Sequence, residues 1–219
     1  GQKGKQMNYV IQVTDLVKSF GKEIVLHHIN VNFASGKIHG IIGRNGSGKT
    51  MLMKCICGFI PVTSGKVTVF GKVIGKDVDI PDNIGAIIET PGFLPEYSAY
   101  RNLKFLADIN GKASKENIRN AMQSVGLDPD SRKHVGKFSL GMRQRLGLAQ
   151  AIMEDPDLLI LDEPMNGLDK DGVQDMRSYL LHLKEQGKTI LLASHSAEDI
   201  SVLCDTVCEM DKGKLTIIS

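Results

Sequence analysis

Eight consecutive residues, Gly43–Thr50, constrain the fold of this chain more than any other segment. Their sequence, GRNGSGKT, matches the pattern G-x-x-x-x-G-K-[ST] in full, after a predicted strand at 37–42 and at the start of a predicted helix at 50–57. Glycines allow a tight turn whose backbone N–H groups point inward, and the N-terminus of the helix adds its dipole. A glycine-rich turn that binds nothing is the alternative. The full match in this context favours a phosphate-binding loop.

Phosphate chemistry assigns separate tasks to the residues of this loop. Lys49 is expected to reach the terminal phosphates, and the Thr50 hydroxyl is expected to bind Mg²⁺. The backbone of the other residues would surround the phosphate groups. The predicted phosphate-binding residues are Gly43, Arg44, Asn45, Gly46, Ser47, Gly48, Lys49 and Thr50.

A second segment, Leu158–Glu163 (LLILDE), supplies the acidic groups that such a loop requires. Four consecutive aliphatic residues are typical of a strand buried on both faces in a parallel sheet. That strand would deliver Asp162 to its carboxyl end, where the carboxylate can hold the magnesium ion. Glu163 would orient an attacking water and take its proton. A core strand that meets a solvated acidic turn is the alternative, and the upstream phosphate loop favours the catalytic interpretation.

Strand-like and helix-like segments alternate along the rest of the chain, as α/β packing requires. The predicted strands are 9–15, 24–33, 37–42, 66–74, 84–88, 158–161, 189–193, 207–210 and 215–218. The predicted helices are 50–57, 99–109, 115–125, 139–154 and 172–185. A helical stretch is thus inserted between two halves of an α/β sheet.

Length and charge limit the classes of protein to which the chain can belong. Its 219 residues favour one large domain, which we place at 7–219, with 1–6 as a tag remnant or a disordered segment. A net charge of +2 gives no electrostatic footprint for nucleic acid, so no nucleic-acid partner is expected. No stretch approaches the ~20 apolar residues of a membrane-spanning helix. A soluble protein, or the soluble part of a larger assembly, is expected.

Four further features give the chain a resemblance to the ATP-binding subunits of ABC transporters, in which similar features occur in the same order. Residues 138–145 (FSLGMRQR) are similar to the signature of that family, usually LSGGQ followed by RQR. Phe20 matches the aromatic residue that stacks on adenine, 166–169 (NGLD) resembles the D-loop, and His195 matches the switch histidine. The resemblance covers 10–218. It implies a P-loop NTPase (RecA-like) core with an antiparallel β subdomain and an inserted α-helical subdomain at roughly 93–154.

The resemblance also implies roles for these residues. Ser139 and the Gly141 amide would face the γ-phosphate of ATP bound by a second subunit, and Asp169 of the D-loop would join the nucleotide-binding residues. His195 would sense the γ-phosphate through a hydrogen bond. Each role has a simpler alternative: Ser139 as an ordinary helix N-cap, His195 as a surface histidine, and Phe20 as a core or turn aromatic.

The chain departs from the family pattern within the signature and at Glu89. Leu140 and Met142 replace the first glycine and the glutamine of the signature, whereas Gly141 is retained. Glu89 stands where the family usually has a glutamine that touches Mg²⁺ and the attacking water. A carboxylate beside a divalent cation would stay ionised and bind it more strongly than an amide; a solvated strand-end glutamate is the alternative. The predicted catalytic residues are Lys49, Glu89, Glu163 and His195, and the predicted metal ligands are Thr50, Glu89 and Asp162.

The stretches 87–93 (IIETPGF) and 139–146 (SLGMRQRL) resemble the ATP-binding subunits of bacitracin-resistance and lantibiotic-immunity transporters. That resemblance implies an ATPase, with ATP as substrate and Mg²⁺ as cofactor, which powers a separate membrane permease. It also implies a homo- or heterodimer on ATP binding, held through the permease at the cytoplasmic face of the membrane. Two alternatives stay open: a soluble ABC ATPase without a transport role, and a nucleotide-dependent regulatory module.

The segment 90–97 (TPGFLPEY) carries an unusually high number of apolar side chains for a loop that connects a strand to a helix. Two prolines and a glycine keep it out of regular structure. Phe93, Leu94 and Tyr97 are nonetheless apolar where a surface loop is expected. By resemblance to the family, we interpret them as the rim of a groove that receives a short helix of the permease. The alternative is a satellite core under the helical insertion.

Overall fold

The computed structural model describes residues 8–89 and 92–219, so the segment 1–6 and the prediction for Thr90 and Pro91 lie outside the described residues. A six-stranded sheet in the order β10-β9-β3-β8-β7-β6 forms the centre of the molecule. Its strands are β3 (Ile38–Ile42), β6 (Ile84–Ile87), β7 (Leu158–Asp162), β8 (Thr189–Ala193), β9 (Thr206–Asp211) and β10 (Lys214–Ile217). Neighbouring strands pair in parallel, except that β10 is antiparallel to β9. The predicted parallel core is confirmed.

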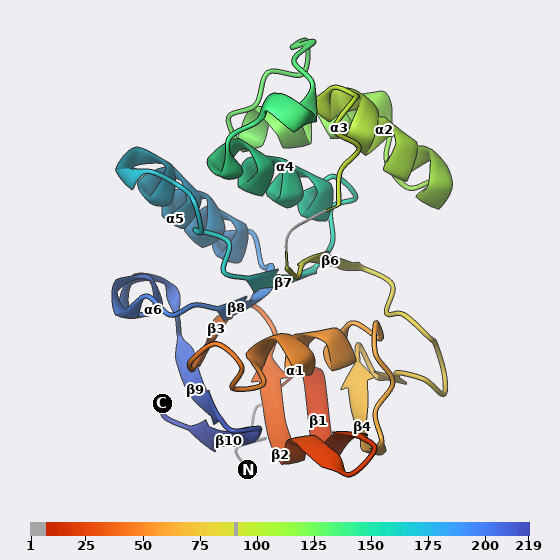
Figure 1. Cartoon of the computed structure of the whole chain (residues 1–219), viewed down its shortest axis with the longest axis vertical. Coiled ribbons are helices and arrows are strands. Elements are labelled where there is room, and N and C mark those ends of the chain that lie inside the picture. The colour runs from red at the N-terminus through yellow and green to blue at the C-terminus, as the bar shows by residue number, and fades with distance from the viewer. Residues whose placement is uncertain (1–7, 90–91) are drawn as a thin grey trace, which may run out of the picture.

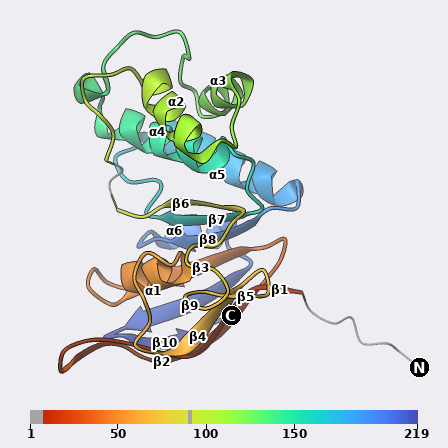
Figure 2. The same ribbon diagram turned by 90° about the vertical axis from the view of Figure 1, so that its right-hand side faces the viewer.

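Apolar side chains of the central strands point alternately to the two faces of this sheet. In β7, Leu158 and Ile160 belong to one hydrophobic core, whereas Leu159 and Leu161 belong to the other. The core with Leu159 and Leu161 includes α5 (Lys170–Glu185) and the helical subdomain, and the core with Leu158 and Ile160 includes α1 (Lys49–Ile56) and a second sheet. Figure 2 shows these layers, with α1 between the two sheets.

The second sheet is antiparallel and has the order β2-β1-β4-β5. Its strands are β1 (Tyr9–Phe20), β2 (Glu23–Ala34), β4 (Ser64–Val69) and β5 (Lys72–Val73). The single strand predicted at 66–74 is wrong, because the chain reverses at Phe70 and Gly71, whose φ values are 48° and 77°. Two positive φ values suit a hairpin turn, but a phenylalanine in the first position gives no turn signal in the sequence.

Three helices form a subdomain at the end of the molecule opposite the antiparallel sheet (Figure 1). They are α2 (Ala99–Asn110), α3 (Lys115–Ser124) and α4 (Leu140–Ile152), and a short 3-10 helix, η1 (Val135–Lys137), precedes α4. Ser98, Ser114 and Ser139 cap these three helices, since each side chain accepts a backbone N–H from the first turn. The three predicted helices are confirmed, with ends shifted by at most two residues.

The carboxyl ends of four parallel strands bring the predicted functional segments to one edge of the central sheet. There β3 leads into the phosphate loop, β7 ends at Asp162, β8 precedes His195, and β6 precedes Glu89. Ligands of α/β proteins bind at this edge. A further helix, α6 (Ala197–Leu203), follows β8 and was not predicted. None of the helices in the described part of the chain is both long enough and apolar enough to span a membrane.

Candidate nucleotide-binding site

The predicted phosphate loop forms a tight turn between β3 and α1. Gly43, Gly46 and Gly48 have φ values of 149°, 80° and 109°, in the region that favours glycine. At Gly43 a Cβ atom would lie 2.4 Å from the carbonyl oxygen of Met210, so a larger residue does not fit. The Ser47 hydroxyl is buried and has no hydrogen-bond partner among the described residues. Such an orphaned polar atom is expected in a loop built to receive an anion.

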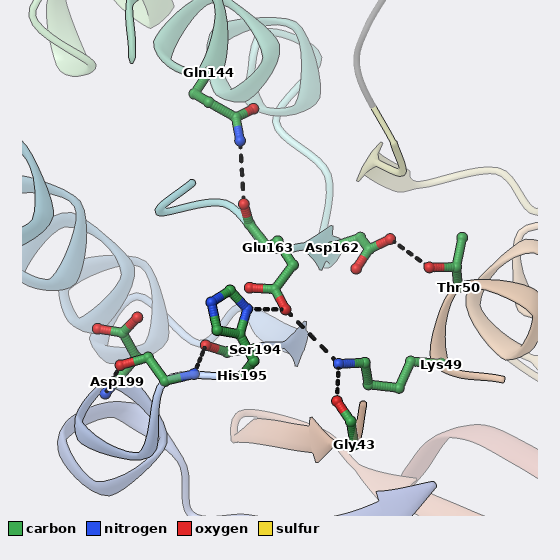
Figure 3. A network of polar contacts seen from close by, with 10 residues as sticks. Gly43, Lys49, Thr50, Gln144, Asp162, Glu163, Ser194, His195 and Asp199 are labelled. Atoms are coloured by element: carbon green, nitrogen blue, oxygen red, sulfur yellow. Dashed lines mark hydrogen bonds and ion pairs between the residues drawn. The ribbon is translucent and has the colours of Figure 1, made fainter. Parts of the chain in front are cut away.

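Lys49 is buried, and its ammonium group lies between the loop and β7. Nζ donates a hydrogen bond to the Gly43 carbonyl and lies 3.7 Å from Oε1 of Glu163 (Figure 3). Arg44 and Asn45 are exposed, and they line a cavity of about 410 Å³ together with Lys49 and Glu163. The loop and the acidic end of β7 therefore line the same cavity.

Asp162 ends β7 opposite the first residues of α1. Its Oδ2 accepts a 2.8 Å hydrogen bond from the Thr50 hydroxyl. Burial raises the pKa of Asp162, and the charges of Glu163 and Glu89 add to this, whereas the Thr50 hydrogen bond and Lys49 oppose it. A divalent cation at these two oxygens would favour the ionised carboxylate and reverse the raised pKa. The side chains of Thr50 and Asp162 thus fit the predicted magnesium position.

The described residues contain no cluster of three or more His, Cys, Asp or Glu side chains suited to a metal ion.

Glu163 follows Asp162 directly, and its carboxylate contacts His195, the second residue after β8. Oε1 lies 2.8 Å from Nδ1 of His195. Glu163 also has a positive φ of 50°, which is uncommon for a residue with a side chain. Gln144 of α4 donates a 3.1 Å hydrogen bond to the Glu163 carbonyl (Figure 3). Sequence reasoning gave Gln144 no role, because no local pattern shows that α4 packs against this carbonyl.

Glu89 lines the same cavity, but its charge is already paired. Its side chain is 61% exposed, and Oε1 lies 2.9 Å from Nζ of Lys54. Lys54 was not predicted to belong to the site. Its spacing of four residues from Thr50 puts both side chains on one face of α1, which is the signal that points to it. The site therefore holds a Glu89–Lys54 pair where the sequence predicted a lone carboxylate.

Seven predicted residues are not among the described residues that line this cavity. Three of them, Gly43, Ser47 and His195, were described above, and the other four are Phe20, Ser139, Gly141 and Asp169. Ser139 caps α4, which is the simpler alternative considered above, and Asp169 caps α5. Gly141 lies in the first turn of α4. The ring of Phe20 is 50% exposed at the end of β1, with Nζ of Lys18 4.8 Å from its centre.

The loop that leads to α2 is more tightly packed than the sequence predicted. Phe93 packs against the core of the helical subdomain, and the Tyr97 ring meets Phe105 edge on, with centroids 5.1 Å apart. The side chain of Asn102 holds the backbone of Leu94 with hydrogen bonds of 2.7 and 3.0 Å. These contacts favour the satellite-core alternative for Phe93 and Tyr97, whereas the side chain of Leu94 is exposed.

Comparison with known proteins identifies the family. The profile of the ABC transporter family matches residues 26–166. The chain is 45% identical over 206 residues to the uncharacterized ABC transporter ATP-binding protein YybJ of Bacillus subtilis (strain 168), covering 94% of both chains. It is 43% identical to the bacitracin transport ATP-binding protein BcrA of Enterococcus faecalis, covering 95% of this chain and 68% of BcrA.

The lantibiotic transport ATP-binding protein SrtF of Streptococcus pyogenes is 37% identical, with coverage of 95% of this chain and 90% of SrtF. The fold matches the dimeric structure of a bacterial ABC transporter cassette with a TM-score of 0.84 at 20% identity, over 94% of this chain and 96% of the cassette. The resemblance to the bacitracin and lantibiotic subfamily is thus confirmed. The chain belongs to the ABC transporter family, as one of its ATP-binding subunits.

Proposed function

We propose that this ABC ATPase drives a separate membrane permease, and that the pair exports peptide antibiotics of the bacitracin or lantibiotic kind or gives immunity to them. The observation that carries the ATPase chemistry is the meeting of three groups, since the Glu163 carboxylate lies within 3.7 Å of both Lys49 and His195. The names of the relatives BcrA and SrtF support the class of substrate.

Binding of ATP would begin at the phosphate loop. Its backbone N–H groups would surround the phosphates, and Lys49 would exchange its bond to the Gly43 carbonyl for phosphate oxygens. Thr50 and Asp162 would hold Mg²⁺, which supplies positive charge against the phosphates when bound. Glu89 would contribute to the same position, because it lines the same cavity as Thr50 and Asp162.

Hydrolysis would use the groups at the ends of β7 and β8. Glu163 would take a proton from the attacking water, as a carboxylate positioned beside the phosphates can. His195 contacts Oε1 of Glu163, the carboxylate oxygen that also lies near Lys49. His195 would therefore orient Glu163 and present its ring to the γ-phosphate. Phe20 would stack on adenine from the end of β1.

One chain would not complete this site. Ser139 and Gly141 lie at the N-terminus of α4, which is an anion-binding position, yet they do not line the phosphate cavity. In a pair of subunits each chain would close the site of the other with these residues and with the D-loop, including Asp169. ATP bound between the subunits would therefore hold them together. The dimeric state of the matched cassette supports this arrangement.

The permease would hold the chain at the cytoplasmic face of the membrane. Phe59 and Ile80 are 53% and 54% exposed and line a groove of about 730 Å³ beside β6. Large exposed apolar side chains around a groove mark binding surfaces. We assign the docking of the permease to this groove, since Phe93 and Tyr97 are occupied by contacts within the chain.

The experiment that tests this function measures phosphate release and size-exclusion profiles with ATP and Mg²⁺. Lys49→Ala is expected to lose nucleotide binding, because a charge on the phosphates is removed. Glu163→Gln is expected to keep binding and to accumulate as an ATP-bound dimer. If Glu163→Gln stays monomeric while the wild type hydrolyses ATP, the dimer assignment is wrong. Phosphate release that does not respond to permease-containing membranes would favour a soluble ABC ATPase without transport.

A further inference from the structure

Gln144 connects the signature segment to the residue proposed as the general base. Among the described residues of α4 it is the buried polar side chain, with 8% exposure. Its Nε2 donates a hydrogen bond of 3.1 Å to the backbone carbonyl of Glu163. We propose that Gln144 is a positioning residue, which holds the backbone of Glu163 so that its carboxylate points at the nucleotide. This proposal rests on the proposed function.

The backbone of Glu163 needs such support because of its conformation. Its φ of 50° is strained for a residue with a side chain, and strained backbone persists only when its surroundings hold it. The Glu163 N–H donates to the Ala193 carbonyl at 2.9 Å, and the Glu163 carbonyl accepts from the Asn166 N–H at 3.1 Å. Gln144 adds a third bond, from a different subdomain. Loss of this bond would free the peptide that aims the carboxylate.

The first turn of α4 also packs closely against the residues that follow Glu163. A Cβ atom at Gly167 would lie 2.4 Å from Cγ of Leu140, and one at Gly141 would lie 3.0 Å from the Gly167 carbonyl oxygen. The turn and the 163–167 segment are therefore in direct contact without spare volume. A displacement of the signature turn would move the Glu163 backbone with it.

In the proposed dimer the contact between α4 and the Glu163 segment would couple the two nucleotide-binding sites. The first turn of α4 would face the nucleotide held by the partner, while Glu163 acts on the nucleotide held by its own phosphate loop. Gln144 lies one turn after Gly141 on the same helix. Its hydrogen bond therefore connects the turn that faces the partner's nucleotide to the backbone of Glu163. Engagement of one site would thus set the geometry of the base in the other.

The test uses the full chain with Gln144→Met, which keeps the length of the side chain but removes the N–H donor. Gln150→Met is the matched control, because Gln150 is a half-buried glutamine on the same helix. Gln144→Met is expected to lower kcat for ATP hydrolysis by about ten- to a hundredfold, the cost of misplacing a catalytic group by about 1 Å. The KM for ATP is expected to stay within about twofold, and Gln150→Met is expected to match the wild type.

A second readout separates positioning from general damage. If only the base is misplaced, Gln144→Met with an intact Glu163 is expected to accumulate as an ATP-bound dimer on size exclusion, as Glu163→Gln does. Misfolding would remove this dimer. A wild-type kcat overturns the proposal, and so does a lower kcat accompanied by loss of the dimer. If Glu163→Gln itself stays monomeric, the proposed dimeric function is wrong. The role of Gln144 is then decided by the kcat of Gln144→Met relative to that of Gln150→Met, with both values normalised to bound nucleotide.

Discussion

A buried lysine positions the exposed ring that is proposed to stack on adenine. Lys18 is 8% exposed, and its Nζ donates a 2.7 Å hydrogen bond to the Pro61 carbonyl. The same ammonium lies 4.8 Å from the centre of the Phe20 ring. A cation over one face attracts the ring electrostatically and leaves the other face to a base. The hydrogen bond from Lys18 to Pro61 joins β1 to the loop before β4, and the sequence did not reveal this contact.

Removal of the ring is expected to weaken ATP binding more than removal of the cation. Phe20→Ala is expected to raise the Kd at least about fivefold, because base–aromatic stacking contributes about 1–3 kcal/mol. Lys18→Met is expected to raise it about two- to fivefold, for a cation–π attraction of about 0.5–1 kcal/mol. Titration with a fluorescent nucleotide measures both, with Phe70→Ala, another exposed turn aromatic, as the control. An unchanged Kd in Phe20→Ala would mean that adenine lies elsewhere.

Glu89 offers a test of the metal position at the level of one charge. Glu89→Gln removes one negative charge near the cation but no phosphate contact, so it is expected to change the Mg²⁺ and Mn²⁺ dependence of hydrolysis and leave the ATP affinity within about twofold. Lys54→Met is expected to shift the metal dependence in the opposite direction, because it frees the Glu89 carboxylate. Metal titrations of the hydrolysis rate measure both variants. The same metal dependence in all three proteins would support a merely solvated glutamate.

At the scale of elements, the sequence predicts what local patterns encode. The strands at 158–161 and 189–193 are short apolar runs, and Lys212–Gly213 turns as expected, with φ values of 47° and 77°. The helix α6 was missed because its seven residues are too few for a periodic pattern and its support comes from a distant residue, Arg177. The break between β4 and β5 was missed because Phe70 resembles a strand residue.

The candidate site likewise contains residues that the sequence predicts and residue pairs that it does not. The phosphate loop, Asp162 and Glu163 could be predicted because each motif is contiguous and its task follows from residue type. The pairs Gln144–Glu163 and Lys54–Glu89 could not, since each joins segments whose proximity depends on the packing of the subdomains.

Arg177 and Asp199 form a buried pair that holds α6 against α5. Nε and Nη2 of Arg177 lie 2.8 and 2.6 Å from Oδ1 of Asp199, and the two residues are 7% and 4% exposed. Arg177→Met is expected to lower the free energy of unfolding by about 3–5 kcal/mol, because it leaves a buried carboxylate unpaired. Urea unfolding measures this, and Arg177→Met with Asp199→Leu is expected to recover part of the loss. Equal stability of the single and double variants would contradict the pairing.

His39 in β3 is expected to make folding sensitive to acid. Its Nε2 lies 2.8 Å from the Ala34 carbonyl oxygen, which only accepts, so Nε2 carries the hydrogen and Nδ1 accepts from the Thr206 hydroxyl at 2.6 Å. Burial lowers the pKa of His39 below its ordinary value of 6.5. Below pH 6.5 the unfolded chain therefore binds this proton more readily than the folded chain, and the free energy of unfolding falls as the pH decreases towards the pKa of the folded state.

The measurement is urea unfolding at pH 7.5 and 5.5. The wild type is expected to lose more unfolding free energy between these two pH values than His39→Gln. His182→Gln, which removes an exposed histidine on α5, is expected to behave as the wild type. Equal losses in the wild type and His39→Gln would assign the acid sensitivity to other groups.

At the scale of the whole molecule, the groove beside β6 is expected to couple ATP hydrolysis to the membrane permease. The double change Phe59→Ser and Ile80→Ser is expected to leave phosphate release by the isolated chain unchanged, because both side chains are exposed and neither lines the phosphate cavity. It is expected to abolish co-purification with the permease and any resistance to peptide antibiotics. Ile217→Ser and Ile218→Ser, exposed at the end of the chain, serve as the control.

Co-purification of the groove variant at wild-type yield would show that the permease docks elsewhere. The change of Phe93 and Tyr97 to alanine then becomes informative. From their packing we expect that pair to lower the stability of the helical subdomain. A stable variant that no longer binds the permease would restore the interpretation drawn from the sequence.

The sharing of central strands between two hydrophobic cores has a consequence for how the subunit is made. In the sheet, β3 pairs with β8 and β9, which lie near the opposite end of the sequence, and such long-range pairing slows folding. The antiparallel strands and α1 leave the ribosome first, but the faces that cover them on β7 and β8 are synthesised late. A nascent chain stopped before β8 would leave both hydrophobic cores exposed, so it is expected to need chaperones until β8 and β9 have been synthesised.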